Sequence, residues 1–171
     1  MADTNLLVSH DPGHTATAKA SVENALKEVK ESPKFLKSNA EGLFFLRVKN
    51  PRTAIKSLSK LLGKKPELFS YTHHWMPVDV WCSSGIPAMK EAVKKLQAGI
   101  KKEEKWKMEL NKRNYDKGNT VELILRLTEG VDRPNVDLEK PKKILKVEIS
   151  GSKAGISLIT PEEMLAIPAS E

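Results

Sequence analysis

The sequence has few of the features that mark enzymes, secreted proteins and membrane proteins. Its single cysteine, Cys82, excludes an internal disulfide framework and is typical of a reducing cytosol. No apolar run approaches the roughly 20 residues that a membrane helix needs. The N-terminus has neither the basic region nor the long apolar core of a secretory signal. These absences predict a soluble, cytoplasmic protein.

Recognisable catalytic motifs are also scarce. There is no Gly-x-Gly and therefore no dinucleotide or kinase phosphate loop, and there is no Walker lysine motif. Cys82 could be a nucleophile with His73 or His74 as its base, but its apolar Val-Trp-Cys context favours an inert core thiol. Adjacent histidines in a strand point to opposite faces, which disfavours joint chelation. We expect no catalytic residue, metal or cofactor; a small RNA-modifying enzyme using Cys82 and a histidine is the alternative.

Aromatic residues make up only 5% of the chain. The three tryptophans are expected mainly in the core, although one of them could stack on a nucleic-acid base. The strand that contains Phe44 and Phe45 imitates an RRM strand but lacks the glycine-rich RRM pattern. The two phenylalanines are therefore predicted to pack on opposite sides of one sheet.

Positive charge is the property that the chain has in excess, with a net charge of +7. Residues 42–66 carry seven basic and no acidic side chains, and residues 84–117 carry ten basic against five acidic ones. Such concentration favours a positive face that meets a polyanion. A solvated, lysine-rich helix surface is the other interpretation.

Hydrophobic spacing in the first half predicts strand, helix, strand, strand, helix, strand, which is the ferredoxin-like order. We assign it to residues 1–71. Thr15 is expected to cap the first helix, Asn50-Pro51 to start the second and Gly63 to end it. The predicted strands cover residues 5–9, 34–38, 43–49 and an extended stretch from 68 towards 82.

A new pattern begins in the second half, assigned to residues 72–171. A helix opens at Gly85-Ile86-Pro87, and residues 106–110 alternate as a half-buried strand does. Asn119 and Glu122 form a capping box for a helix whose expected core is Val121, Ile124 and Leu125. Two strands, 144–149 and 154–159, flank the turn Gly151-Ser152-Lys153, and Thr160-Pro161 starts a short final helix. The predicted fold class is α+β.

Two segments of the second half resemble a known family. Residues 105–113, Lys-Trp-Lys-Met-Glu-Leu-Asn-Lys-Arg, resemble the THUMP-domain strand that ends in Lys-Arg. Residues 136–159 resemble the THUMP signature, with Val-Asp-Leu, a proline, an alternating strand and Gly151-x-Lys153-x-Gly155-x-Ser157. The resemblance covers about residues 72–160. It implies an α/β tRNA-binding module that follows a ferredoxin-like domain.

THUMP domains are typically fused to thiouridine synthases, RNA methylases or pseudouridine synthases. No such domain follows Glu171, so the chain resembles the freestanding tRNA-acetyltransferase adaptor branch. That resemblance implies an accessory protein, not an enzyme, which presents tRNA to a separate acetyltransferase for N4-acetylcytidine formation. The expected partners are the acceptor end and stem of tRNA and an RNA acetyltransferase. The competing hypothesis is a general module that binds RNA or an acidic protein.

The resemblance also points to the RNA-binding residues. It implicates Lys112 and Arg113 at the strand end and Lys153 in the turn, while Gly151 and Gly155 would let backbone N–H groups approach phosphate. Two alternatives stay open: a plain hairpin turn at Lys153, and a salt bridge from Arg113 to Asp116. Four further lysines are added on charge alone, namely Lys101, Lys102, Lys105 and Lys107.

Overall fold

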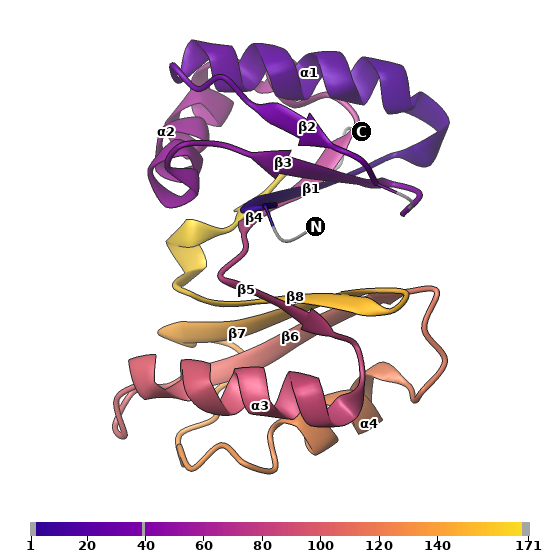
Figure 1. The fold of residues 1–171 in the computed structure, drawn as a ribbon. Coiled ribbons are helices and arrows are strands. Elements are labelled where there is room, and N and C mark those ends of the chain that lie inside the picture. Colours follow the sequence, from indigo (N-terminus) through magenta and orange to yellow (C-terminus); the bar gives the residue numbers. More distant parts are fainter. Residues whose placement is uncertain (1–2, 39, 169–171) are drawn as a thin grey trace. The chain divides into compact units, whose positions relative to one another are not determined.

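The computed structural model describes residues 3–38 and 40–168, which form two compact units (Figure 1). One unit comprises Met1–Pro77 with Glu162–Glu171, and the other comprises Val78–Pro161. Each unit combines helices with one β-sheet, so the predicted α+β class is confirmed. No helix in the described part of the chain is long and apolar enough to cross a membrane.

The first unit has the ferredoxin-like order. Its sheet runs β2-β3-β1-β4-β9, and each of the first four strands is antiparallel to its neighbour. The strands are β1 (Leu6–His10), β2 (Lys34–Leu36), β3 (Leu43–Arg47), β4 (Thr72–Pro77) and β9 (Leu165–Ala166). The helices are α1 (Thr15–Glu28) and α2 (Pro51–Lys64), and 3-10 turns cover Pro12–His14 and Pro66–Phe69.

Both helices of this unit pack against one face of its sheet, because their apolar stripes and alternate strand residues meet there (Figure 1). Leu6 and Val8 of β1 contribute to this core together with Val22 of α1 and Ile55 of α2. Trp75 is fully buried, and its indole N–H donates to Thr72 Oγ1 over 3.1 Å. The core prediction for this tryptophan is confirmed.

Three expected helix signals act differently in the structure. Thr15 is the first residue of α1, not its cap, because Asp11 already caps the preceding 3-10 turn. Asn50 occupies the N-cap of α2 without a side-chain bond, and Glu31 accepts hydrogen bonds from the N–H groups of Lys49 and Asn50 instead. Gly63 lies inside α2, one residue before its end.

The second unit has four strands, with sheet order β5-β8-β7-β6. Only the β6–β7 pair is parallel. Helices α3 and α4 cover one face of this sheet (Figure 1). The elements are β5 (Val80–Ser83), α3 (Ile86–Leu96), a 3-10 turn (Gln97–Gly99), β6 (Trp106–Arg113), α4 (Thr120–Leu127), β7 (Lys143–Ser150) and β8 (Lys153–Ile159).

Helix α4 begins as predicted but buries a different face. Asn119 caps the helix as predicted, with the N–H of Glu122 donating to Asn119 Oδ1 over 2.9 Å. The Glu122 carboxylate accepts from the Asn119 side-chain amide over 2.6 Å, not from the backbone N–H of a capping box. Leu123 and Leu127 are buried and the predicted Ile124 packs against the core, whereas Val121 and Leu125 are 67% and 64% exposed. In an eight-residue helix with apolar side chains around most of its circumference, spacing alone does not decide which stripe meets the core.

The boundary between the units lies at Pro77–Val78, not at residues 71–72, and the chain returns to the first unit after Pro161. Strand β4 pairs with β1, with Trp75 opposite Val8. The expected final helix is a 3-10 turn, Pro161–Glu163, followed by β9, which pairs with β4. Strand patterning reports alternation but not which sheet receives the strand. The prediction of a final helix was therefore wrong, and the division by contacts differs from the predicted one at residues 71–72.

Candidate nucleic-acid interface

The C-terminal end of β6 and the turn between β7 and β8 lie side by side. In the parallel pairing Arg113 is opposite Ser150, and the N–H of Gly151 donates to the Arg113 carbonyl over 2.9 Å. Lys153 begins β8 on the far side of the turn, where its side chain is exposed. The structure thus brings together the sequence-predicted Lys112, Arg113, Gly151 and Lys153, and we call this region the turn end.

Two hydroxyl groups fix the backbone at the turn end. Ser84 Oγ donates to the Gly151 carbonyl over 2.7 Å, and the Ser84 N–H donates to the Ser152 carbonyl over 2.9 Å. Tyr115 Oη donates to the Ser84 carbonyl over 2.7 Å. The turn is therefore held from two directions, which keeps Lys153 and Arg113 in one neighbourhood before any ligand arrives.

Helix N-termini add positive potential near the turn end. Strand β5 runs antiparallel to β8 and ends with Ser83 opposite Lys153, so α3 begins at the turn end. Helix α4 begins seven residues after β6 stops. Helix N-termini carry partial positive charge. The carboxyl ends of parallel strands are where α/β folds commonly bind ligands.

Arg113 has an acidic partner that sequence reasoning did not identify. Its guanidinium donates to Glu148 Oε1 on β7, and the amide of Asn111 donates to the other carboxylate oxygen over 3.4 Å. The Glu148 side chain is only 6% exposed, whereas that of Arg113 is 29% exposed. The alternative of a bridge to Asp116 is wrong. Glu148 reaches Arg113 because both side chains project from the same face of adjacent strands.

The two predicted glycines have unlike roles. Gly151 has φ +59°, the left-handed conformation that such a turn requires, and a Cβ there would meet open space. Gly155 lies inside β8, where a Cβ would approach the Trp81 ring at 3.1 Å and Val78 Cγ1 at 3.2 Å. Gly155 is therefore a packing residue beneath Trp81. The expectation that its backbone approaches phosphate does not fit this environment.

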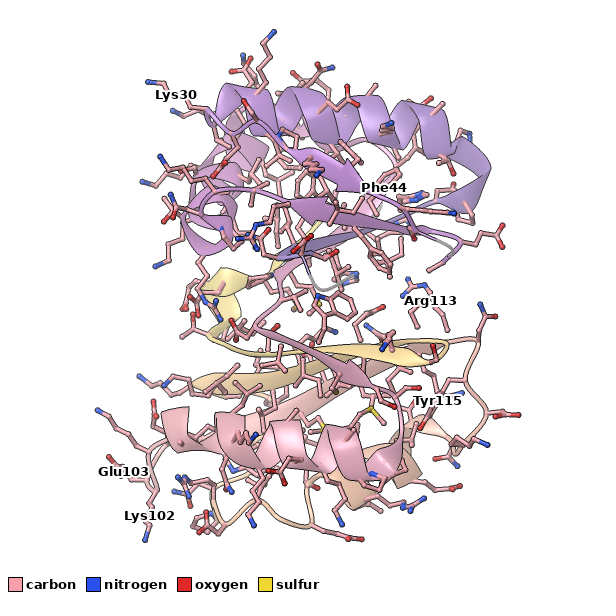
Figure 2. All side chains as sticks on the ribbon, viewed as in Figure 1. Lys30, Phe44, Lys102, Glu103, Arg113 and Tyr115 are labelled. Carbon is pink, nitrogen blue, oxygen red and sulfur yellow. The ribbon has the colours of Figure 1, made fainter. Side chains whose placement is uncertain are left out.

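The lysines added on charge alone lie toward the opposite end of β6. Figure 2 shows Lys102 and Arg113 at opposite ends of the second unit. Eight residues of strand separate these ends by about 23 Å. Lys105 pairs with Asp137 over 3.4 Å and Lys107 with Glu109 over 2.7 Å, while Lys101 and Lys102 are exposed. The nine predicted residues do not form one site.

Some exposed basic side chains were not among the residues predicted to bind RNA. Lys117 is exposed in the loop that follows the turn end. On α2, the exposed Lys56, Lys60 and Lys64 follow one another at four-residue intervals, which places them along one helix face. The signal for α2 was the acid-free run 42–66, which the family resemblance did not cover.

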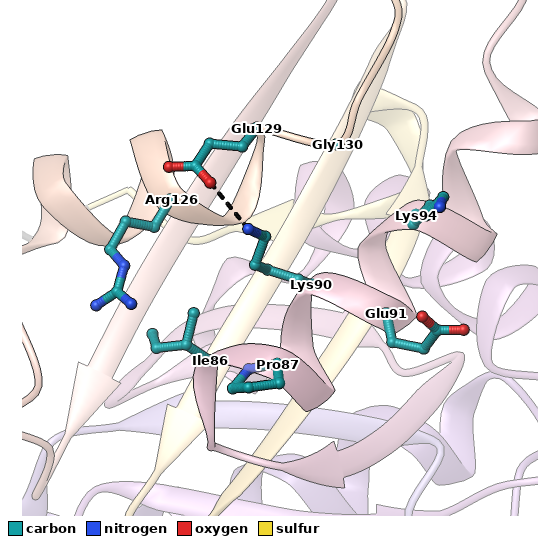
Figure 3. Close-up of a pocket in the computed structure, with 8 residues that line it drawn as sticks. All are labelled: Ile86, Pro87, Lys90, Glu91, Lys94, Arg126, Glu129 and Gly130. Atoms are coloured by element: carbon teal, nitrogen blue, oxygen red, sulfur yellow. Dashed lines mark hydrogen bonds and ion pairs between the residues drawn. The ribbon is translucent and has the colours of Figure 1, made fainter.

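A groove of about 560 Å³ lies between α3 and α4 (Figure 3). Its charged lining is mixed: Lys90, Lys94 and Arg126 stand with Glu91 and Glu129. Lys90 is bound to Glu129 over 2.8 Å, and this hydrogen bond and charge hold the pKa of Glu129 below its usual value. The groove therefore presents mostly neutralised charge to a ligand.

The alternative cysteine site is not assembled within either unit. Cys82 is on β5 of the second unit, and His73 and His74 are on β4 of the first. Burial raises the pKa of the Cys82 thiol, and the nearby Lys153 charge only partly opposes this. A thiol in this state is a poor nucleophile near neutral pH. Within the described residues, no three His, Cys, Asp or Glu side chains cluster as metal ligands.

Neither a protein-family model nor a curated protein matches this chain. Solved structures do share its fold. PH1313 from Pyrococcus horikoshii Ot3 matches 95% of the chain with a TM-score of 0.68 and 14% identity. TrmN from Thermus thermophilus matches 90% with a TM-score of 0.55 and 15% identity. A predicted N6-adenine-specific DNA methylase from Listeria monocytogenes str. 4b F2365 matches 91% with a TM-score of 0.60 and 9% identity.

The alignments cover nearly all of this chain but only 55%, 44% and 40% of those three proteins, respectively. At such low identities the likeness concerns the fold alone. The chain has a THUMP-like fold. This agrees with the fold that the sequence resemblance implied for residues 105–113 and 136–159.

Proposed function

We propose that the chain binds tRNA and that Val78–Pro161 is its THUMP module. The observation that supports this most directly is the turn end, where Lys112, Arg113 and Lys153 lie beside a left-handed turn and the start of α3. Cations and backbone N–H groups at one edge suit phosphate oxygens. The lysines of α2, which lie in a segment without acidic residues, would add phosphate contacts from the first unit.

The same proposal gives the chain an accessory role. It presents the acceptor end and stem of tRNA to a separate RNA acetyltransferase, which forms N4-acetylcytidine. The support is the resemblance to the tRNA-acetyltransferase adaptor branch, together with the raised pKa of the Cys82 thiol, which is the side chain that an enzymatic alternative would require. Of the residues predicted to bind RNA, we retain Lys112, Arg113, Gly151 and Lys153.

Salt dependence of tRNA binding tests the first part. Each phosphate that a lysine or arginine neutralises releases counterions, so log affinity should fall against log salt concentration by about one unit per contact. We expect a slope of several units, measured by fluorescence anisotropy with labelled tRNA. Polyglutamate of similar charge serves as the competitor. A flat salt profile, or equal competition by polyglutamate, contradicts the tRNA proposal.

Reconstitution tests the accessory role. The purified chain with tRNA and an acetyl donor should yield no N4-acetylcytidine, and the matching acetyltransferase should yield it when the chain is added. Nucleoside mass spectrometry measures the product. Acetylation by the chain alone, or acetyltransferase activity that is indifferent to the chain, contradicts this part while leaving tRNA binding to be judged by the anisotropy result.

A further inference from the structure

An exposed pair of stacked rings lies in the first unit, where β1 leads into α1. His14 and Tyr71 are 4.0 Å apart between ring centroids and 4° from parallel. Tyr71 is 42% exposed, more than any other phenylalanine, tyrosine or tryptophan among the described residues. The His14 side chain is 48% exposed. His14 and Tyr71 thus present aromatic surface to solvent side by side.

Hydrogen bonds hold the His14 ring and the backbone of Tyr71 in position. The N–H of Asp11 donates to the Tyr71 carbonyl over 2.9 Å, which ties the two backbone segments together. The Asp11 carboxylate accepts from the N–H of Gly13 over 2.8 Å and contacts His14 Nδ1 at 3.1 Å. The carboxylate is thereby hydrogen-bonded within the cluster, and the imidazole ring is oriented without any ligand.

Tyr71 also has a strained backbone. Its φ is +62°, a conformation that a bulky side chain rarely adopts. Such strain persists only where the surroundings enforce it, and it concentrates at functional positions. Here the strained residue is the one that carries the exposed ring. The fold therefore holds Tyr71 against His14 despite a backbone preference to the contrary.

We propose that the His14–Tyr71 pair is a stacking platform for an unpaired RNA base, a role that rests on the proposed RNA-binding function. The rings already have a spacing and parallelism close to those of stacked bases, so a flat heterocycle can extend the stack without rearrangement. Single-stranded RNA is commonly recognised by bases that stack on aromatic side chains. The platform would grip a base irrespective of sequence, because every base has a π-face.

The test compares variants of the full chain binding a short single-stranded RNA that contains one 2-aminopurine, and binding tRNA. Tyr71→Asn removes the ring with a side chain that tolerates positive φ, and His14→Ala removes its stacking partner. Each should weaken oligonucleotide binding about tenfold at every salt concentration. The slope of log affinity against log salt should stay unchanged, because stacking releases no counterions. Tyr71→Phe, which keeps the ring, should bind as the unmodified chain does.

The two proposals fail in different ways. If the unmodified chain binds neither RNA, both are overturned. If it binds RNA but Tyr71→Asn retains full affinity and full 2-aminopurine quenching, only the platform is overturned. Ultraviolet crosslinking of the unmodified chain gives a result that does not depend on a variant folding, and its adduct should map to Tyr71 or His14. Adducts confined to other residues would also overturn it.

Discussion

The lysines of α2 and the basic residues of β6 have different electrostatic surroundings. Lys56, Lys60 and Lys64 are exposed, and within the described residues none of them forms an ion pair. Along β6, by contrast, Lys107 is paired with Glu109, and Arg113 with Glu148. A paired cation must exchange a carboxylate for a phosphate, whereas a free one releases only counterions. Counting basic residues therefore overstates the phosphate-binding capacity of the second unit.

The largest expected effect is on stability, and it separates Arg113 from a free surface cation. Arg113→Ala leaves the nearly buried Glu148 carboxylate without its charged partner. Loss of one partner of a buried pair lowers the free energy of unfolding considerably. Because Arg113 is partly exposed, we expect a decrease of about 2–3 kcal/mol, less than for a fully buried pair. Urea denaturation measures this loss.

A second substitution distinguishes the uncompensated charge from lost packing. In the Arg113→Ala/Glu148→Gln double variant the buried carboxylate becomes neutral, and Asn111 still offers its amide 3.4 Å from that group. Much of the lost stability should return. If Arg113→Ala denatures at the same urea concentration as the unmodified chain, the pairing with Glu148 contributes little to stability. Arg113 can then bind a phosphate without a loss of folding stability.

The next effect is on salt dependence, and it tests whether the unpaired α2 lysines contact phosphate. Replacement of Lys56, Lys60 and Lys64 by alanine should lower the slope of log tRNA affinity against log salt by about two to three units. Low-salt affinity should fall tenfold or more. The matched control removes the paired cations Lys105 and Lys107, with a change below one unit. Equal slopes for the two variants would show that pairing with a carboxylate does not reduce the contribution of a lysine to phosphate binding.

Lys153 should have a smaller effect, because it is a single cation. It is exposed at the turn end, and no ion pair involves it within the described chain. Lys153→Ala should weaken tRNA binding several-fold for all tRNA sequences alike, about 1 kcal/mol, with an unchanged Tm. Lys27→Ala, an exposed position on α1, is the control. A loss of affinity limited to some tRNAs would instead indicate base recognition at the turn.

Local signals predicted the elements well, because their causes lie within a few residues. The alternation of Trp106, Met108 and Leu110 gives β6, and the Asn119 and Glu122 pair gives the start of α4. The turn at Gly151 follows from its own sequence. These features need no knowledge of distant residues, so propensity and pattern are sufficient.

What the sequence did not predict depends on pairing across the chain. Whether residues 72–77 and 165–166 join the first or the second sheet is decided by strand register with β1 and β4. The partner of Arg113 is set by the parallel alignment of β6 with β7, 35 residues apart in sequence. Gly155 looks like a turn residue until Trp81 is placed over it. These features depend on tertiary contacts, which local patterns in a single sequence do not predict.

The smallest expected effect uses Cys82 as a reporter on Lys153. Burial raises the pKa of this thiol, and the Lys153 charge lowers it in part. Alkylation by iodoacetamide should therefore be slower at pH 7 than for a free cysteine, and its rate should keep rising above about pH 8.5, where a free thiol levels off. Because the folded state favours the protonated thiol, its contribution to stability is complete below the unfolded-state pKa. That contribution is lost as pH rises through the higher folded-state pKa.

Lys153→Ala removes the opposing charge, so the pKa of Cys82 should rise further and the rate at pH 8 should fall by less than about threefold. Saturating tRNA should slow alkylation in the unmodified chain, because phosphates at the turn end offset the same charge. In Lys153→Ala tRNA should change the rate much less. The test compares the alkylation rate with and without tRNA in the unmodified chain and in Lys153→Ala. A separate control is the urea-unfolded chain: if Cys82 of the folded, unmodified chain is alkylated as fast as in that control, the thiol is not buried. An equal response to tRNA in both proteins places the RNA away from Lys153 and leaves the α2 lysines as the main contacts.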